Sequence, residues 1–164
     1  MISCFQELVV VKYDRGDSYM AYLIAVIILA VDQITKYIIR VNFDYGESIP
    51  IIEDIFHLTY VTNPGGAFGI FQDLTIFFIV SSVVIIVAFP FILKNIPELD
   101  SENILYKLSL GLIIGGAAGN LIDRVFFGYV IDFFDFQIWP VFNVADSAVV
   151  VGCFILFFMV WRAA

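Results

Sequence analysis

Long apolar runs separated by short polar stretches dominate this chain. A helix that spans the hydrocarbon core of a bilayer needs about 20 mostly apolar residues. The clearest run extends from Leu74 to Leu93, between Asp73 and Lys94, and holds no charged residue. Three further runs reach the required length if a few polar residues lie within them. The pattern therefore predicts four spanning helices, at about residues 19 or 21–39, 74–93, 105–122 and 142–161.

The segments outside these runs differ in character. Residues 41–73 include SIPIIEDIFHLTYVT, in which β-branched and aromatic residues lie between Pro and Gly punctuation. This composition favours short strands or an interfacial platform. The first 19 residues are polar and irregular, and they lack the features of a signal peptide. We expect residues 1–19 to be a dispensable extension of a single domain over residues 20–164.

The composition requires a bilayer. Of 164 residues, 62% are hydrophobic and only 15% are charged, with a mean hydropathy of +0.98. No soluble domain of this size buries that much apolar surface. The net charge of −8 argues against nucleic acid as a partner, because phosphates need a basic face. Cys4 and Cys153 are far apart and lack neighbouring His, so no metal site and no cofactor is expected.

The distribution of Lys and Arg over the loops predicts an orientation. The four-span topology places five basic residues on one side of the membrane, namely Lys12, Arg15, Lys94, Lys107 and Arg162. On the other side it places Lys36, Arg40 and Arg124. Because positive residues favour the cytoplasmic side, this modest bias places both termini in the cytoplasm. Segments 40–73 and 123–141 then face outward.

Several polar residues interrupt the first and third spans. Asp32 and Lys36 lie one helical turn apart and can form an ion pair, which lowers the cost of keeping both near lipid. Such a pair suits an anchor at the helix end at least as well as a catalytic role. Asn120 lies within the third span and needs a hydrogen-bond partner. Asp123 and Arg124 follow, either as an interfacial ion pair or with Arg124 holding a lipid phosphate or a peptide carbonyl.

Small residues mark two further features. The third span carries Gly111, Gly115 and Gly119 at intervals of four, which indicates a face that allows another helix to approach closely. Asn63-Pro64-Gly65-Gly66 joins the outward segment to the second span and demands a tight backbone path. It is either an ordinary turn or a loop whose Asn63 amide or backbone amides meet a peptide carbonyl.

Asp132 and Asp146 are the most informative residues of the chain. They lie in the segments GYVIDFFDF and VFNVADSAVVVG. Ionisable residues close to the hydrocarbon of a bilayer are energetically costly, so they are rare and usually functional. Taken singly, Asp146 fits a helix N-terminal charge favoured by the macrodipole. Two such carboxylates, with two Asn and an Arg nearby in sequence, favour a site. A carboxylate pair that shares one proton can activate a water with one member and protonate a leaving amine with the other.

Four segments together resemble the lipoprotein signal peptidase family, the type II signal peptidases of bacteria. In the family's order and spacing they are VDQITKYIIR (31–40), FHLTYVTNPGGAFGIF (56–71), GGAAGNLIDRVFFGYVIDFFDF (115–136) and FNVADSAVVVG (142–152). The resemblance covers roughly residues 21–161. It implies an all-α membrane protein of four transmembrane helices, with a small extracytoplasmic β-cradle between helices 1 and 2.

The resemblance also implies a chemistry. The family is an intramembrane aspartyl endopeptidase of the bacterial plasma (inner) membrane, which removes signal peptides from prolipoproteins by cutting before a diacylglyceryl-modified cysteine. Asp132 matches the carboxylate of the family's G-x-V-x-D-F segment and Asp146 that of F-N-x-A-D, so these two would form the catalytic dyad. The family's supporting residues fall on Asp32, Lys36, Asn63, Gly65, Asn120, Asp123, Arg124 and Asn143. The implied partners are diacylglyceryl prolipoproteins, membrane lipid and the cyclic peptide inhibitor globomycin.

Two other functions are compatible with intramembrane acids. A small proton-coupled transporter could use Asp32, Lys36, Asp132 and Asp146 as a relay. Such a transporter favours charges near the bilayer midplane and internal repeats, whereas these acids cluster near one surface. A non-enzymatic scaffold held by ion pairs would not require both Asp132 and Asp146.

Overall fold

The computed structural model describes residues 15–65, 75–96, 99–100 and 103–163. Within these ranges the helices are α1 (Arg15–Asn42), α2 (Thr75–Lys94), α3 (Ile104–Phe127) and α4 (Val144–Ala163). All of them are long and apolar enough to cross a membrane, which confirms the four spans predicted from the sequence. Most of the predicted N-terminal extension, residues 1–14, lies outside the described residues.

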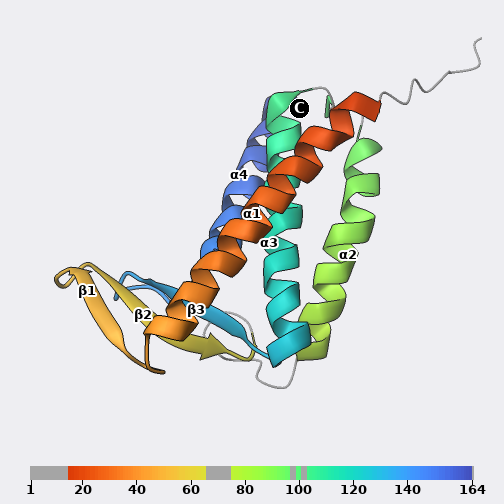
Figure 1. Ribbon diagram of the computed structural model, residues 1–164. Helices are drawn as coiled ribbons and strands as arrows, with labels where there is room; N and C mark the ends of the chain where they lie inside the picture. The colour runs from red at the N-terminus through yellow and green to blue at the C-terminus, as the bar shows by residue number, and fades with distance from the viewer. Residues whose placement is uncertain (1–14, 66–74, 97–98, 101–102, 164) are drawn as a thin grey trace, which may run out of the picture.

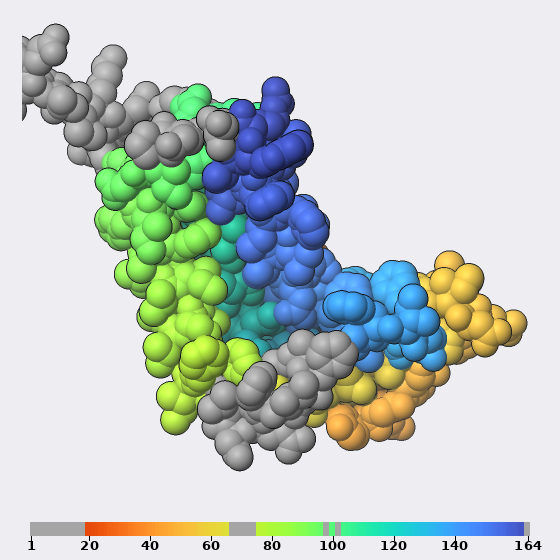
Figure 2. All heavy atoms as spheres, turned by 180° about the vertical axis from the view of Figure 1, so that it is seen from behind, coloured from red at the N-terminus to blue at the C-terminus, as the bar shows by residue number. Residues whose placement is uncertain are grey.

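α3 is the central helix of the bundle. It packs against α1, α2 and α4, and it is the helix with the largest buried share (Figure 1). Figure 2 shows the opposite side of the molecule, where α3 lies at the base of a furrow between α2 and α4. The beginning of α1 and the end of α4 lie at the same end of the bundle, as an even number of spans requires. Side chains of α3 can therefore meet side chains from every other helix.

Glycines on α3 permit its close packing. An ideal Cβ placed on Gly115 would lie 2.7 Å from the backbone oxygen of Ala25 on α1. A Cβ placed on Gly116 would meet the backbone oxygen of Ala145 on α4. Real Cβ atoms do not approach backbone oxygens so closely, so these positions must lack one. The predicted glycine face is confirmed, and it packs against α1.

A three-stranded antiparallel sheet lies at the end of the bundle opposite to the first residues of α1 (Figure 1). Its strands are β1 (Ser48–Ile52), β2 (Phe56–Asn63) and β3 (Val130–Asp135), in the order β1-β2-β3. The first two strands lie in the segment where the sequence predicted short strands. The third strand was not predicted. It lies between α3 and α4, so the sheet extends beyond the segment between the first two helices.

The pairing of β2 with β3 brings two candidate residues together. Asn63 lies opposite Val130, two residues before Asp132, so Asn63 and Asp132 are diagonal neighbours on one face of the sheet. Ile131 points to the other face, where it is buried in a cluster with Ile39 of α1. This apolar contact fixes the sheet to the end of α1, close to the polar residues of the first span.

Candidate active site

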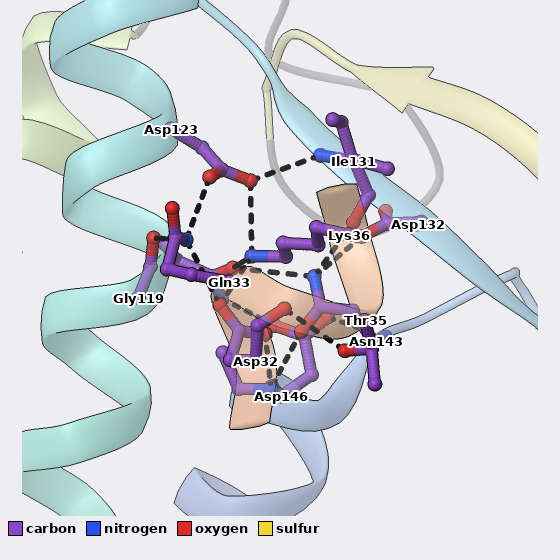
Figure 3. Close-up of polar contacts among 12 residues, drawn as sticks. Asp32, Gln33, Thr35, Lys36, Gly119, Asp123, Ile131, Asp132, Asn143 and Asp146 are labelled. Carbon is purple, nitrogen blue, oxygen red and sulfur yellow. Dashed lines mark hydrogen bonds and ion pairs between the residues drawn. The ribbon is translucent and has the colours of Figure 1, made fainter. Parts of the chain in front are cut away.

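Asp132 and Asp146 reach one polar cluster from different elements. Asp132 lies on β3 and is 2% exposed, whereas Asp146 lies in the first turn of α4 and is half-buried. Asn143, directly before α4, contacts both of them. Its side-chain Nδ2 donates to Asp132 Oδ1 at 2.6 Å, and its backbone N–H donates to Asp146 Oδ2 at 3.2 Å. The structure thus brings the two predicted carboxylates together through one asparagine (Figure 3).

Asn143 also caps the N-terminus of α4. Its side-chain Oδ1 accepts a hydrogen bond from the backbone N–H of Asp146 at 2.8 Å, and the Asp146 carboxylate accepts one in return from the Asn143 N–H. This reciprocal pattern is a capping box, with Asp in place of the usual Glu or Gln. Asp146 is therefore a helix N-terminal charge, as its position in the sequence suggested, and a member of the polar cluster as well.

Side-chain amides bind the remaining carboxylate oxygens. Asn63 Nδ2 donates to Asp132 Oδ2 at 3.0 Å, and Asn120 Nδ2 donates to Asp146 Oδ1 at 2.7 Å. Burial and the nearby charge of Asp146 nevertheless raise the pKa of Asp132 to about 7, because they disfavour its ionised form more than the amides favour it. A carboxyl with this pKa retains its proton over much of the range up to neutral pH.

Lys36 lies at the centre of a buried ionic cluster behind the two carboxylates. Its Nζ lies 2.9 Å from Asp32 Oδ2 and 2.9 Å from Asp123 Oδ2 (Figure 3). It also donates to Asn120 Oδ1 at 2.9 Å. All three charged side chains are almost fully buried. The predicted pair of Asp32 and Lys36 is confirmed, and Asn120 has the partners that its depth requires. Because an ammonium has three donors, the cluster uses all of them.

The two acids of this cluster also hold neighbouring backbone groups. Asp32 Oδ1 accepts from the backbone N–H of Ala145 at 2.9 Å, which adds a cap from α1 to the start of α4. Asp123 Oδ2 accepts from the backbone N–H of Ile131 at 3.2 Å, one residue before Asp132. Asp32 and Asp123 therefore anchor the two elements that carry the paired carboxylates.

Arg124 makes contacts other than the ion pair with Asp123, which was one of the two alternatives predicted for it. Among the described residues no ion pair joins it to Asp123, whose carboxylate is bound by Lys36, by Gln33 and by the β3 backbone. The Arg124 guanidinium lies 4.9 Å from the centroid of the Phe78 ring on α2, and its Nη1 donates to the Asn120 backbone oxygen at a long 3.4 Å. Its Nε is buried with no hydrogen-bond partner in the described part of the chain. The Nε–H of Arg124 is thus an unsatisfied buried donor within the described ranges.

Directly after β2, the backbone turns back to the side chain of Asn63, the last residue of that strand. Asn63 Oδ1 accepts from the Gly65 backbone N–H at 3.1 Å, while the Asn63 amide nitrogen is bound to Asp132. Such a turn holds the asparagine side chain in one orientation. Gly66, the next residue of the motif, lies outside the described residues. With its oxygen bound to Gly65, the Asn63 side chain directs its amide nitrogen toward Asp132.

Comparison with known proteins identifies the family. The model of the family described as Signal peptidase (SPase) II matches residues 24–162. This chain belongs to the signal peptidase II family. The proteins named lipoprotein signal peptidase from Moorella thermoacetica and Halothermothrix orenii are 52% identical over 134 residues and 48% identical over 143 residues. These alignments cover 82% and 87% of this chain and 87% and 96% of the two relatives.

Solved structures support the same assignment. Two solved structures, each described as a bacterial membrane enzyme structure by the in meso method, at 2.3 Å and 1.9 Å resolution, match with TM-scores of 0.79 and 0.76, each at 33% identity. The first match covers 92% of this chain and 90% of the other, and the second covers 90% and 94%. This member of the signal peptidase II family is thus a multi-pass membrane protein and a peptidase. The comparisons give no support to a transporter.

Two contacts in this signal peptidase II site were not predicted from the sequence. Gln33 of α1 contacts Asp123, and Phe78 of α2 lies under the guanidinium of Arg124. A polar Gln within a spanning helix was a signal for the first contact, because its amide needs a partner. Phe78 gave no signal, since it is one apolar residue among many in α2. Within the described ranges, no three His, Cys, Asp or Glu side chains gather to hold a metal ion.

Proposed function

We propose that this chain is an aspartic endopeptidase that removes signal peptides from diacylglyceryl-modified bacterial prolipoproteins, cutting before the lipidated cysteine. The family match and the relatives named lipoprotein signal peptidase support this substrate class. The observation that carries the catalytic type is the contact of Asn143 with both Asp132 and Asp146. Asp32 and Asp123 are already paired with Lys36, which leaves the first two acids for proton transfer.

The catalytic pair begins the reaction with one proton. Because burial and Asp146 raise the pKa of Asp132 to about 7, we assign the proton to Asp132 and the negative charge to Asp146. Asp146 takes a proton from a water whose oxygen attacks the scissile carbonyl carbon, and Asp132 gives its proton to the carbonyl oxygen. As the tetrahedral diol collapses, the C–N bond breaks. The leaving nitrogen receives the proton from Asp146, and Asp132 recovers its proton from a diol hydroxyl.

Arg124 is the residue that we assign to substrate binding. Arg124 follows Asn120 by one helical turn on α3, and its guanidinium lies against the ring of Phe78. Its buried Nε lacks a partner among the described residues. A guanidinium donates through a planar fork, which suits a peptide carbonyl, an ester carbonyl of the diacylglyceryl group or a lipid phosphate. Asn63 supports the catalytic pair by donating its side-chain amide to Asp132, and the Gly65 backbone N–H holds that amide in place.

We place the site at the outer face of the bacterial plasma (inner) membrane, with both termini in the cytoplasm. The bias of Lys and Arg between the loops supports this orientation. The sheet lies at the end of the bundle away from the start of α1. Its strand β3 carries Asp132, which fits a site at one surface. Residues 1–19 are then a cytoplasmic extension that cleavage does not require. Globomycin is expected to inhibit the enzyme, as the family resemblance implies.

A gel-shift cleavage assay tests the proposal. Purified protein in detergent is incubated with a diacylglyceryl prolipoprotein, beside the variants Asp132→Asn and Asp146→Asn. The matched control is Asp135→Asn on the same strand, because the Asp135 carboxylate accepts from the Thr59 hydroxyl at 2.8 Å and does not contact the pair. We expect cleavage by the wild type and by Asp135→Asn only.

Each part of the proposal has its own refuting outcome. Wild-type turnover by Asp132→Asn or Asp146→Asn would refute the catalytic pair. Absence of cleavage by folded wild type, with lipid and detergent varied, would refute the peptidase. Arg124→Lys keeps the positive charge but loses the planar set of N–H donors of the guanidinium, so we expect a raised KM for the lipidated substrate. Equal cleavage of lipidated and unlipidated substrate by the wild type would refute recognition of the lipid.

A further inference from the structure

Gln33 is a polar residue of α1 that the proposed mechanism does not use. It is half-buried, and its amide points toward α3 (Figure 3). The amide Nε2 donates to Asp123 Oδ1 at 2.9 Å, and it lies 3.2 Å from both the Gly119 backbone oxygen and Asp32 Oδ2. An amide on a spanning helix needs such partners, since hydrocarbon offers none. Gln33 therefore joins α1 to α3 within the polar cluster.

The contact of Gln33 complements that of Lys36. The Lys36 ammonium and the Ile131 backbone N–H both bind Oδ2 of Asp123, whereas Gln33 binds Oδ1. Among the described residues Gln33 is the donor to that oxygen, and Asp123 is only 1% exposed. Without Gln33 the oxygen would be buried and unpaired. The carboxylate would then be free to turn about its Cβ–Cγ bond and would no longer present Oδ2 to both of its partners.

We propose that Gln33 is a positioning residue for Asp132, acting through Asp123 and the backbone of β3. Gln33 fixes the orientation of the Asp123 carboxylate, and that carboxylate holds the N–H of Ile131, the residue before Asp132. The Ile131 carbonyl oxygen also accepts from Asn143 Nδ2 at 3.3 Å, and this amide binds Asp132 itself. A shift of β3 would misplace the Asp132 carboxylate, although Gln33 itself does not contact the substrate. The inference rests on the proposed function.

Two substitutions at Gln33 separate this role from a merely structural one. Gln33→Leu removes the donor, so we expect kcat on a diacylglyceryl prolipoprotein to fall roughly tenfold while KM changes by less than about twofold. Gln33→Glu keeps the shape of the side chain. The introduced carboxylate, when ionised, cannot donate and repels Asp123, whereas its protonated form donates an O–H to the same oxygen. The ratio of kcat in Gln33→Glu to kcat in the wild type should therefore rise as the pH falls from about 8 to about 5.

Thr35→Val is the matched control on the same helix. The Thr35 hydroxyl donates to the backbone oxygens of Val31 and Asp32, at 2.8 Å and 2.9 Å, and so remains within α1. We expect wild-type kcat and KM from this variant. If Gln33→Leu does not fold, the pH dependence of Gln33→Glu carries the test.

The outcomes of this experiment are distinct. Wild-type kcat in Gln33→Leu would overturn the inference, and so would a kcat ratio for Gln33→Glu that does not change with pH. A reduced kcat in Thr35→Val equal to that in Gln33→Leu would also overturn it, because any polar loss in α1 would then suffice. Absence of cleavage by the wild type would refute the proposed function itself, which is a different result from loss in the Gln33 variants only.

Discussion

Replacing Asp132 with Asn is expected to abolish cleavage and, near neutral pH, to stabilise the fold. Burial and the charge of Asp146 raise the pKa of Asp132 from 3.8 to about 7 in the folded protein. In the unfolded chain the carboxyl has its ordinary pKa. One pKa unit corresponds to about 1.4 kcal/mol, so the shift corresponds to on the order of 4 kcal/mol in the free energy of unfolding.

The sign of the effect follows from proton binding. Because the pKa is raised on folding, the folded state binds the proton more tightly than the unfolded state does. The resulting contribution is complete below a pH of about 4 and is lost as the pH rises through about 7. The side-chain amide of Asp132→Asn does not ionise, so the variant does not lose stability over this range. The free energy of unfolding of the variant relative to the wild type should rise between pH values of about 4 and 7 and then level off.

An amide at position 132 also has a cost that does not depend on pH. Asn63 and Asn143 both donate side-chain amides to the Asp132 carboxylate, so the new NH₂ group would face one of these donors. Neither neighbour can turn over, because their Oδ1 atoms accept from the backbone N–H groups of Gly65 and Asp146. A buried donor without an acceptor costs about 1–3 kcal/mol. The variant should therefore be less stable than the wild type near pH 4 and more stable near pH 7 and above.

Thermal unfolding in one detergent, at several pH values from about 4 to 8, measures this difference. Asp135→Asn on the same strand controls for the change of side chain outside the proposed catalytic pair. A difference in unfolding midpoint between Asp132→Asn and the wild type that stays constant over the whole range would refute the reasoning. It would mean that Asp132 does not keep its proton through burial, and the assignment of the acid would fail with it.

Three further outcomes follow from the same contacts. The rate of cleavage should fall as the pH rises through about 7, because Asp132 of the proposed catalytic pair then loses its proton. A pH–rate profile that stays flat to about pH 9 would contradict this. Lys36→Met should lower the free energy of unfolding by about 3–5 kcal/mol, because it leaves Asp32 and Asp123 buried without their counter-charge; an unchanged unfolding midpoint would contradict this. Gly115→Val should lower the unfolding midpoint, since its Cβ would lie 2.7 Å from the Ala25 backbone oxygen, and an unchanged midpoint would show that α1 can move away freely.

The spanning helices could be predicted because the bilayer imposes both length and apolarity on each of them. The second span was expected at 74–93, and α2 runs over Thr75–Lys94. The strand β3 could not be predicted in the same way. Its sequence VIDFFD shows no clean alternation, and its existence depends on pairing with β2, which lies far away along the chain. The sequence therefore located the catalytic candidate Asp132 but not the element that carries it.

The site residues could be predicted singly, because a polar group at membrane depth must have a function or a partner. The choice of partner could not. Asp123 meets Lys36 from another helix and not its neighbour Arg124, because the glycines of α3 let α1 cross close to it. The contact of Gln33 depends on the same crossing.

The distribution of charge in the cluster explains why the exchangeable proton should lie on Asp132 and Asp146, the proposed catalytic pair. The Lys36 ammonium contacts Asp32 and Asp123, so its charge is shared by these two acids before it acts on Asp132. Among the described residues no cation forms an ion pair with Asp132, which is bound by neutral amides instead. Neutral donors stabilise a carboxylate less than charged ones do. A buried acid in these surroundings keeps its proton until near neutral pH, and that is the state from which an acid–base pair can begin catalysis.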